Sequence, residues 1–168
     1  MRMAKKVCIY GFSTALCIVF GYLESLIPPV ISVPGIKPGL ANAVALLYIA
    51  KGDIKGAFAV NFTRILLSSL LFSAPFSLVF SLSGAAGSFL VMLLLSKTHK
   101  FSITGLSIAG GTAHNICQTI AAAAVLGKSA WYLLPVLLAS GAVSGAAVGL
   151  LAAFIFKRFK KYKFSVKK

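Results

Sequence analysis

The chain has 168 residues, of which 59% are hydrophobic and only 11% are charged, against about 25% charged residues in a typical soluble domain. Too few polar residues are present to cover the surface of a soluble domain of this size, so the composition excludes that class and indicates an integral membrane protein with one domain. The 17 Lys and Arg residues outnumber the two acids, Glu24 and Asp53. Membrane topology explains this excess better than a nucleic-acid partner does, and we expect no nucleic-acid binding.

Six apolar helical segments follow one another along the chain. Five are long enough to cross the hydrocarbon core, which takes about 20 residues, whereas the second is short and follows a proline-rich loop. In chain order the predicted helices are residues 7–27, 39–50, 54–72, 76–95, 103–126 and 131–156, and residues 157–168 form a basic cytoplasmic tail. The sequence therefore predicts an all-α membrane protein, a single domain 1–168 built as a six-transmembrane-helix bundle.

The basic residues predict how these helices are oriented. With six crossings, the amino terminus, the loops near residues 51–55 and 97–100 and the tail share one side of the membrane. All 17 Lys and Arg residues except Lys37, Lys128 and Arg64 belong to this side, which the positive-inside rule identifies as the cytoplasm. We expect a multi-pass protein of the bacterial cytoplasmic membrane, in contact with membrane lipid, with both termini in the cytoplasm.

Arg64 lies near the middle of the apolar segment 54–72, where a charge costs roughly 2.5–3.5 kcal/mol on insertion scales. Such a residue is usually surrounded by protein, water or ligand. We expect a polar cavity toward the outer half of the bundle, in which Arg64 and His114 meet an anionic group. Glu24 would pair with Arg64, accept a hydrogen bond from a ligand amine, or lie at a solvated helix end.

Other polar residues within the helices would orient neutral atoms of the same ligand; they are Asn42, Asn61, Ser81, Asn115 and Gln118. The alternative interpretation is an internal hydrogen-bond network that joins the helices.

Catalysis has little support in the sequence. No Gly-rich phosphate loop of the Walker type is present, so the chain does not itself hydrolyse ATP in the usual way, and no paired carboxylates are available. His114 and Cys117 lie one turn apart but lack further ligands, so we expect neither a metal nor a cofactor.

Two helices carry small residues at four-residue spacing, which lets helix backbones approach closely. In the last helix the series Gly141, Gly145 and Gly149 predicts internal packing. In the first helix Gly11 and Ala15 fit either packing or contact with a partner subunit.

Ordered motifs along nearly the whole chain carry a family resemblance. They are Glu24 with Ile27-Pro28, the segment Pro34-Gly35-Ile36-Lys37-Pro38-Gly39-Leu40-Ala41-Asn42, Arg64, Ser81-Leu82-Ser83-Gly84, Phe101-Ser102, and His114-Asn115 with Gln118. This set resembles the Gx transporter family, also labelled heptaprenyl diphosphate synthase component I, which is similar to the substrate-binding S components of energy-coupling factor transporters.

The resemblance implies an S-component-like fold that binds a ligand near the outer face. Pro34, Gly35 and Lys37 would belong to a loop that caps the ligand, and Gly11 and Ala15 would contact a transmembrane coupling subunit. Separate ATPase subunits would supply the energy.

The leading hypothesis is a membrane subunit, not an enzyme, that binds a small polar or anionic solute for uptake. The alternative is a non-catalytic accessory component of isoprenoid, heptaprenyl diphosphate or quinone metabolism. Prenyl chain elongation uses aspartate-rich clusters that hold magnesium and diphosphate. Because Asp53 is the only aspartate, this chain cannot be the catalytic subunit of such an enzyme.

Overall fold

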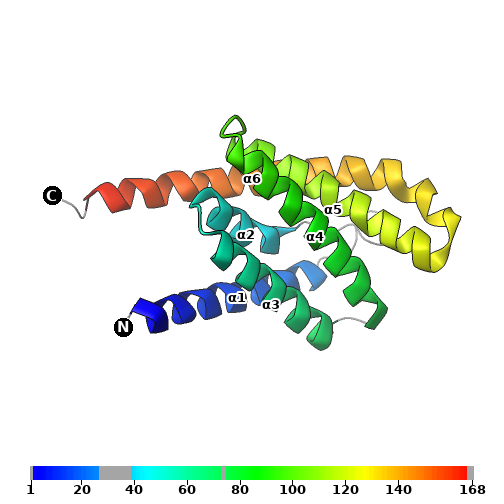
Figure 1. Cartoon of the computed structure of the whole chain (residues 1–168), viewed down its shortest axis with the longest axis horizontal. Coiled ribbons are helices and arrows are strands. Elements are labelled where there is room, and N and C mark those ends of the chain that lie inside the picture. The colour runs from blue at the N-terminus through cyan, green and yellow to red at the C-terminus, as the bar shows by residue number, and fades with distance from the viewer. Residues whose placement is uncertain (1, 27–38, 73–74, 166–168) are drawn as a thin grey trace.

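The computed structural model describes residues 2–26, 39–72 and 75–165, and this part of the chain is helical with no β-strand (Figure 1). Its elements are α1 (Arg2–Leu26), α2 (Leu40–Ala50), α3 (Ile54–Phe72), α4 (Pro75–Lys97), α5 (Ile103–Leu126), the 3₁₀ helix η1 (Lys128–Leu133) and α6 (Leu134–Ser165). The predicted all-α class and the six α-helices are confirmed.

Within the described ranges, four helical segments are long and apolar enough to cross a membrane: Met3–Glu24, Ile54–Leu71, Leu78–Lys97 and Lys128–Arg158. The short helix α2, with 11 residues, rises only roughly 17 Å. The helix α5 has 24 residues but is not among these four segments, and it carries the polar residues His114, Asn115 and Gln118. The structure is that of a membrane protein, and the crossings by α2 and α5 stay predictions.

Several helix ends differ from the predicted ones. The first helix begins at Arg2 rather than at residue 7, and the fourth spans Pro75–Lys97 rather than 76–95. The last predicted helix is divided into η1 and α6, and α6 continues to Ser165 through residues predicted as a tail. Hydropathy marks where the apolar layer ends, whereas Lys and Arg are good helix formers and let the helix continue beyond it.

Local signals explain two of the helix boundaries. Gly39 precedes α2 with φ at 80°, a left-handed conformation that glycine adopts without steric cost. Ser102 begins α5 as its N-cap, and its hydroxyl accepts a hydrogen bond from the backbone N–H of Gly105 at 3.1 Å.

The short helix α2 is the centre of the packing. It contacts α1, α3, α4, α5 and α6, whereas α1 contacts only α2 and α3 among the described elements. Leu46 and Ile49 of α2 are buried in one core cluster with Ala57, Met92 and Leu106, which come from α3, α4 and α5. The α1–α3 and α4–α6 halves of the molecule therefore meet on α2 and along the contact between α3 and α4.

The outward faces of the long helices are apolar. Phe12 on α1, Leu70 on α3 and Val143 on α6 are 73%, 79% and 72% exposed. Such extended exposed apolar surface is unfavourable in water and marks an interaction surface. A lipid environment accounts for it, in agreement with the composition.

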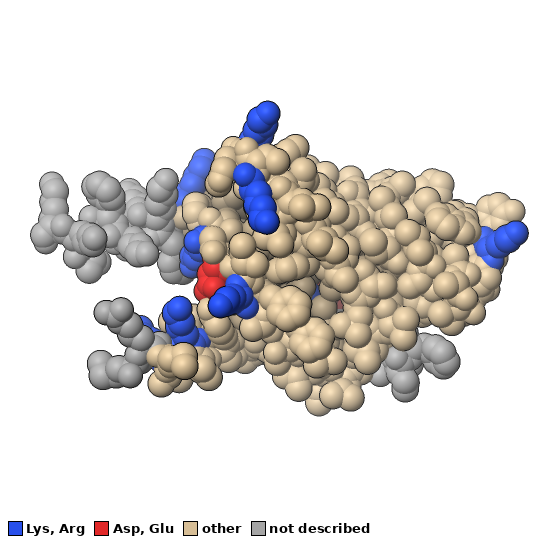
Figure 2. Space-filling view, viewed as in Figure 1, with Lys and Arg blue, Asp and Glu red and all other residues tan. Residues whose placement is uncertain are grey.

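Both termini lie at the same end of the molecule (Figure 1). Lys and Arg side chains gather at this end in Figure 2, around an acidic patch. Here the Tyr10 hydroxyl donates to Asp53 Oδ2 at 2.7 Å and joins α1 to the α2–α3 turn. That hydrogen bond holds the pKa of Asp53 below its usual value, so the carboxylate stays ionised beside the basic residues.

Candidate functional site

Arg64 is held by two uncharged amides. Its Nη2 atom donates to Asn42 Oδ1 at 3.0 Å and to Asn61 Oδ1 at 2.9 Å. Asn61 lies one turn earlier on α3, as the spacing predicts, and Asn42 comes from the start of α2. The Nε atom of Arg64 is fully enclosed and makes no hydrogen bond with the described residues.

Glu24 lies beside this group, at the end of α1. It is 9% exposed, and its Oε1 atom accepts a hydrogen bond from the backbone N–H of Leu40, the first residue of α2. A carboxylate at this position is favourable because the amino end of a helix carries a partial positive charge. Glu24 also interacts electrostatically with Arg64, but the hydrogen bonds that the structure gives for Arg64 go to the two asparagines.

A further contact fixes the start of α2 against α1. The Cys17 thiol, which is buried, donates to the carbonyl oxygen of Ala41 at 3.6 Å. Two helices thus contact the amino end of α2: α1 through Glu24 and Cys17, and α3 through Arg64. We name Glu24, Asn42, Asn61 and Arg64 the arginine cluster.

The polar residues of α5 lie in other surroundings. Asn115 is buried and donates from Nδ2 to the carbonyl oxygen of Leu137 on α6, so it joins two helices. His114 packs against Gly84 of α4, where a Cβ atom would come within 2.7 Å of its ring. Gln118 has an enclosed Oε1 atom with no hydrogen-bond partner among the described residues.

Helices α3 and α5 have no close backbone contact among the described elements, whereas α2, which carries Asn42, does contact α5. The grouping of His114, Asn115 and Gln118 with the arginine cluster stays a prediction. Ser81 is partly buried on α4. Pro34, Gly35 and Lys37 fall outside the described residues.

The two residues predicted for partner contact are exposed on α1. A Cβ atom added to Gly11 would meet nothing within 4 Å, so no helix of the described part packs against this point. Among the described residues, no group of three His, Cys, Asp or Glu side chains is placed to hold a metal ion.

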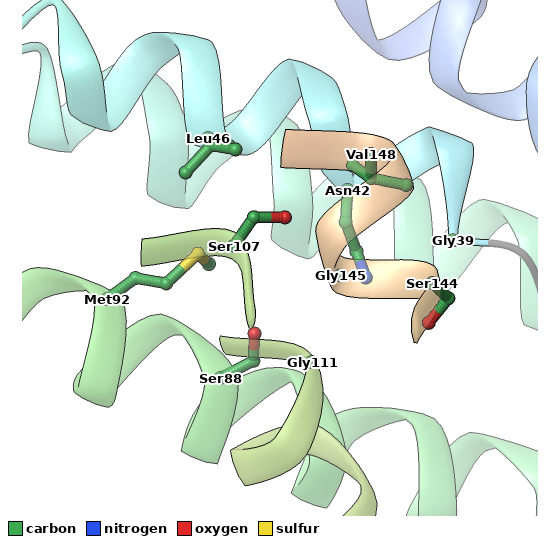
Figure 3. A pocket seen from close by; sticks show the side chains of 10 residues that line it. All are labelled: Gly39, Asn42, Leu46, Ser88, Met92, Ser107, Gly111, Ser144, Gly145 and Val148. Atoms are coloured by element: carbon green, nitrogen blue, oxygen red, sulfur yellow. The ribbon is translucent and has the colours of Figure 1, made fainter. Parts of the chain in front are cut away.

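A small cavity of about 30 Å³ lies on the other side of Asn42, between α2, α4, α5 and α6 (Figure 3). Its polar lining is formed by Asn42, Ser88, Ser107 and Ser144, and its apolar lining includes Leu46, Met92 and Val148. Sites for small molecules usually measure about 300–1,000 Å³, so this cavity accepts only a group of about the size of water. The sequence did not point to Ser107, because a lone serine in an apolar helix has no distinguishing spacing.

Comparison with known proteins supplies one match. A family model described as heptaprenyl diphosphate synthase component I matches residues 13–155, which is most of the chain. No curated protein and no solved structure matches it.

Proposed function

This chain belongs to the heptaprenyl diphosphate synthase component I family, and we propose that it is a non-catalytic membrane subunit that binds a small anionic solute at Arg64 for uptake. The solute would enter from the outer face. Separate energy-coupling subunits would drive its release toward the cytoplasm.

The proposal rests on the Arg64 guanidinium, which has an enclosed N–H donor without a hydrogen-bond partner among the described residues. A guanidinium group has five N–H donors, and among the described residues the hydrogen bonds given for Arg64 are those of Nη2 to the two asparagine amides. The enclosed Nε donor has no partner among the described residues. A buried charge is costly unless it is paired, and a carboxylate or phosphate would supply both the opposite charge and the missing hydrogen bonds.

The geometry also constrains how such an anion would bind. Both bidentate edges of a guanidinium include Nη2, which is already used by Asn42 and Asn61. A solute that binds through two parallel hydrogen bonds therefore displaces one of these amides. If it displaces Asn42, the contact between α2 and α3 loosens, which would couple solute binding to helix packing.

Energy coupling by other subunits has two supports. The chain lacks a Walker-type phosphate loop, and Gly11 with Ala15 presents an exposed surface of small residues on α1. A neighbouring membrane helix could approach closely there.

The test is native mass spectrometry of the gently purified wild-type protein and of an Arg64→Ala variant. We expect a bound solute in the wild type and a loss of roughly 10- to 100-fold in its affinity in the variant, because a charge-assisted hydrogen bond is removed. Gly11→Leu is the matched control. It should retain the solute but copurify less with a coupling subunit. Retention of the solute by Arg64→Ala would refute the assignment.

A second function is favoured by the description of the family itself, namely a membrane accessory component of a prenyl diphosphate synthase. With Asp53 as the only aspartate, the magnesium–diphosphate chemistry would belong to the partner. Copurification with a prenyl synthase, without any bound solute in the mass spectrum, would favour this function over uptake.

A further inference from the structure

The serine hydroxyls in this protein fall into two groups. Most of those on α4 and α6 donate to a backbone carbonyl in the preceding turn, as Ser83 does to Phe80 and Ser140 does to Leu137. This is the usual way in which a membrane helix satisfies a hydroxyl. The structure gives no hydrogen bond to the hydroxyls of Ser68, Ser69, Ser81, Ser88 and Ser107 within the described part of the chain, and of these five only Ser88 and Ser107 line the cavity.

These two serines are nevertheless deeply buried, at 5% and 7% exposure. They come from facing helices, α4 and α5, and both line the 30 Å³ cavity. In Figure 3 their hydroxyls and the Asn42 amide border the same space. Both residues are buried, but their hydroxyls border the open space of the cavity, so a guest in that space would supply the hydrogen-bond partner that the protein does not.

The lining defines the chemistry of this guest. None of the 10 lining residues is charged, which disfavours an ion. Serine hydroxyls donate and accept, and the Asn42 side chain has amide hydrogens to donate once its oxygen has accepted from Arg64. A neutral hydroxyl oxygen, which can also do both, matches this lining, and the volume admits one such group.

We infer that the Ser88–Ser107 cavity is a subsite for one neutral hydroxyl group, supplied either by a bound water or by the solute. Asn42 joins this subsite to Arg64, because its Oδ1 atom accepts from Nη2 while the same side chain lines the cavity. If the solute supplies the hydroxyl group, the inference rests on the proposed function, and the solute is a small hydroxylated anion. If a water molecule supplies it, the inference does not depend on the proposed function.

The first experiment measures thermal unfolding of purified Ser88→Ala and Ser107→Ala. If the hydroxyls bind a guest, each variant should lose about 2–4 °C in melting temperature. If the cavity is dry, removal of an unpaired buried hydroxyl should leave the melting temperature unchanged or raise it, which would overturn the inference.

Ser83→Ala is the matched control on α4, and its melting temperature should change little. Ser88→Cys, a nearly isosteric change with a weaker donor, should give a smaller loss.

The second experiment identifies the source of the hydroxyl. Lactate and propionate, which are of similar size and differ by one hydroxyl, are compared as stabilising additives by the same melting assay. Supply by the solute predicts a larger shift with lactate, lost in Ser88→Ala and Ser107→Ala but kept in Ser83→Ala. Equal shifts, together with the lower melting temperatures of the two alanine variants, assign the hydroxyl to water. The subsite is contradicted if both alanine variants have the melting temperature of the wild type and are still stabilised more by lactate than by propionate.

These outcomes are separable from those for Arg64. If Arg64→Ala keeps its solute while Ser88→Ala and Ser107→Ala are destabilised, the uptake proposal fails and the water subsite stands. If Arg64→Ala loses its solute and both serine variants match the wild type, the uptake proposal stands and the subsite fails.

Discussion

At the scale of single residues, the guanidinium of Arg64 is positioned by two hydrogen bonds to uncharged side chains. Asn42 and Asn61 orient its guanidinium through their amide oxygens without supplying a negative charge. An asparagine in this role leaves the electrostatic attraction for an anion intact, whereas an aspartate would cancel it. The two neutral amides are thus as important to the proposed site as the charge that they hold.

The variant Asn61→Asp tests this distinction with almost no change in side-chain shape. It places a carboxylate about where an oxygen already lies 2.9 Å from Nη2, so we expect a higher melting temperature and a loss of solute affinity of about 10-fold or more. The matched control is Asn115→Asp, in which the new carboxylate faces the Leu137 carbonyl and should lower the melting temperature. Shifts of the same sign in both variants would contradict this account of Arg64.

The part of this site that the sequence predicted is the part within one helix. A charge in an apolar run marked Arg64, and helical spacing placed Asn61 on its face. The partner from α2, Asn42, was among the candidates, but its pairing with Arg64 depends on how α2 packs, which no local pattern records. The same limit applies to His114 and Gln118: whether they share a site with Arg64 depends on helix packing, and α3 and α5 have no close backbone contact among the described elements.

At the scale of helices, close backbone contact between α5 and α6 organises the second half of the molecule. A Cβ atom on Gly111 would lie 2.5 Å from the Gly141 carbonyl oxygen, and one on Gly145 would lie 2.8 Å from the Ser107 carbonyl oxygen. Because these neighbours are backbone atoms, they cannot move aside as the end of a side chain can. The glycine series of α6 therefore serves internal packing, as its spacing predicted.

We expect Gly111→Ala to cost about 1–3 kcal/mol of unfolding free energy, since it over-packs this contact. Gly11→Ala makes the same chemical change on α1, where nothing lies within 4 Å, and should stay within about 0.5 kcal/mol of the wild type. Denaturant titration of both variants in the same detergent measures the difference. Equal stabilities would show that the α5–α6 contact is looser than the structure indicates.

At the scale of the whole molecule, the two termini and most of the visible basic side chains share one end (Figures 1 and 2). The arrangement agrees with six crossings, which the positive-inside rule orients with that end in the cytoplasm. The sequence could predict this global pattern because charge counts do not depend on packing. It could not predict that α6 would continue to Ser165, because hydropathy does not report where a helix ends in water.

Reporter fusions test the orientation. Alkaline phosphatase, which is active only outside the cytoplasm, should be inactive when fused after Lys168 and active when inserted between Gly127 and Lys128, at the α5–η1 junction. Green fluorescent protein at the same positions should give the reverse pattern. If both positions report the same side, the segment between them, η1 with α6, does not cross the membrane and the topology must be revised.

The central place of α2 also bears on how the protein is made. During synthesis α2 leaves the ribosome before α4, α5 and α6, against which its buried residues Leu46 and Ile49 finally pack. Most of the helices that bury α2 are synthesised after it, so its packing cannot be completed when α2 itself has been made. We therefore expect the packing around α2 to be completed only after α4, α5 and α6 have been synthesised.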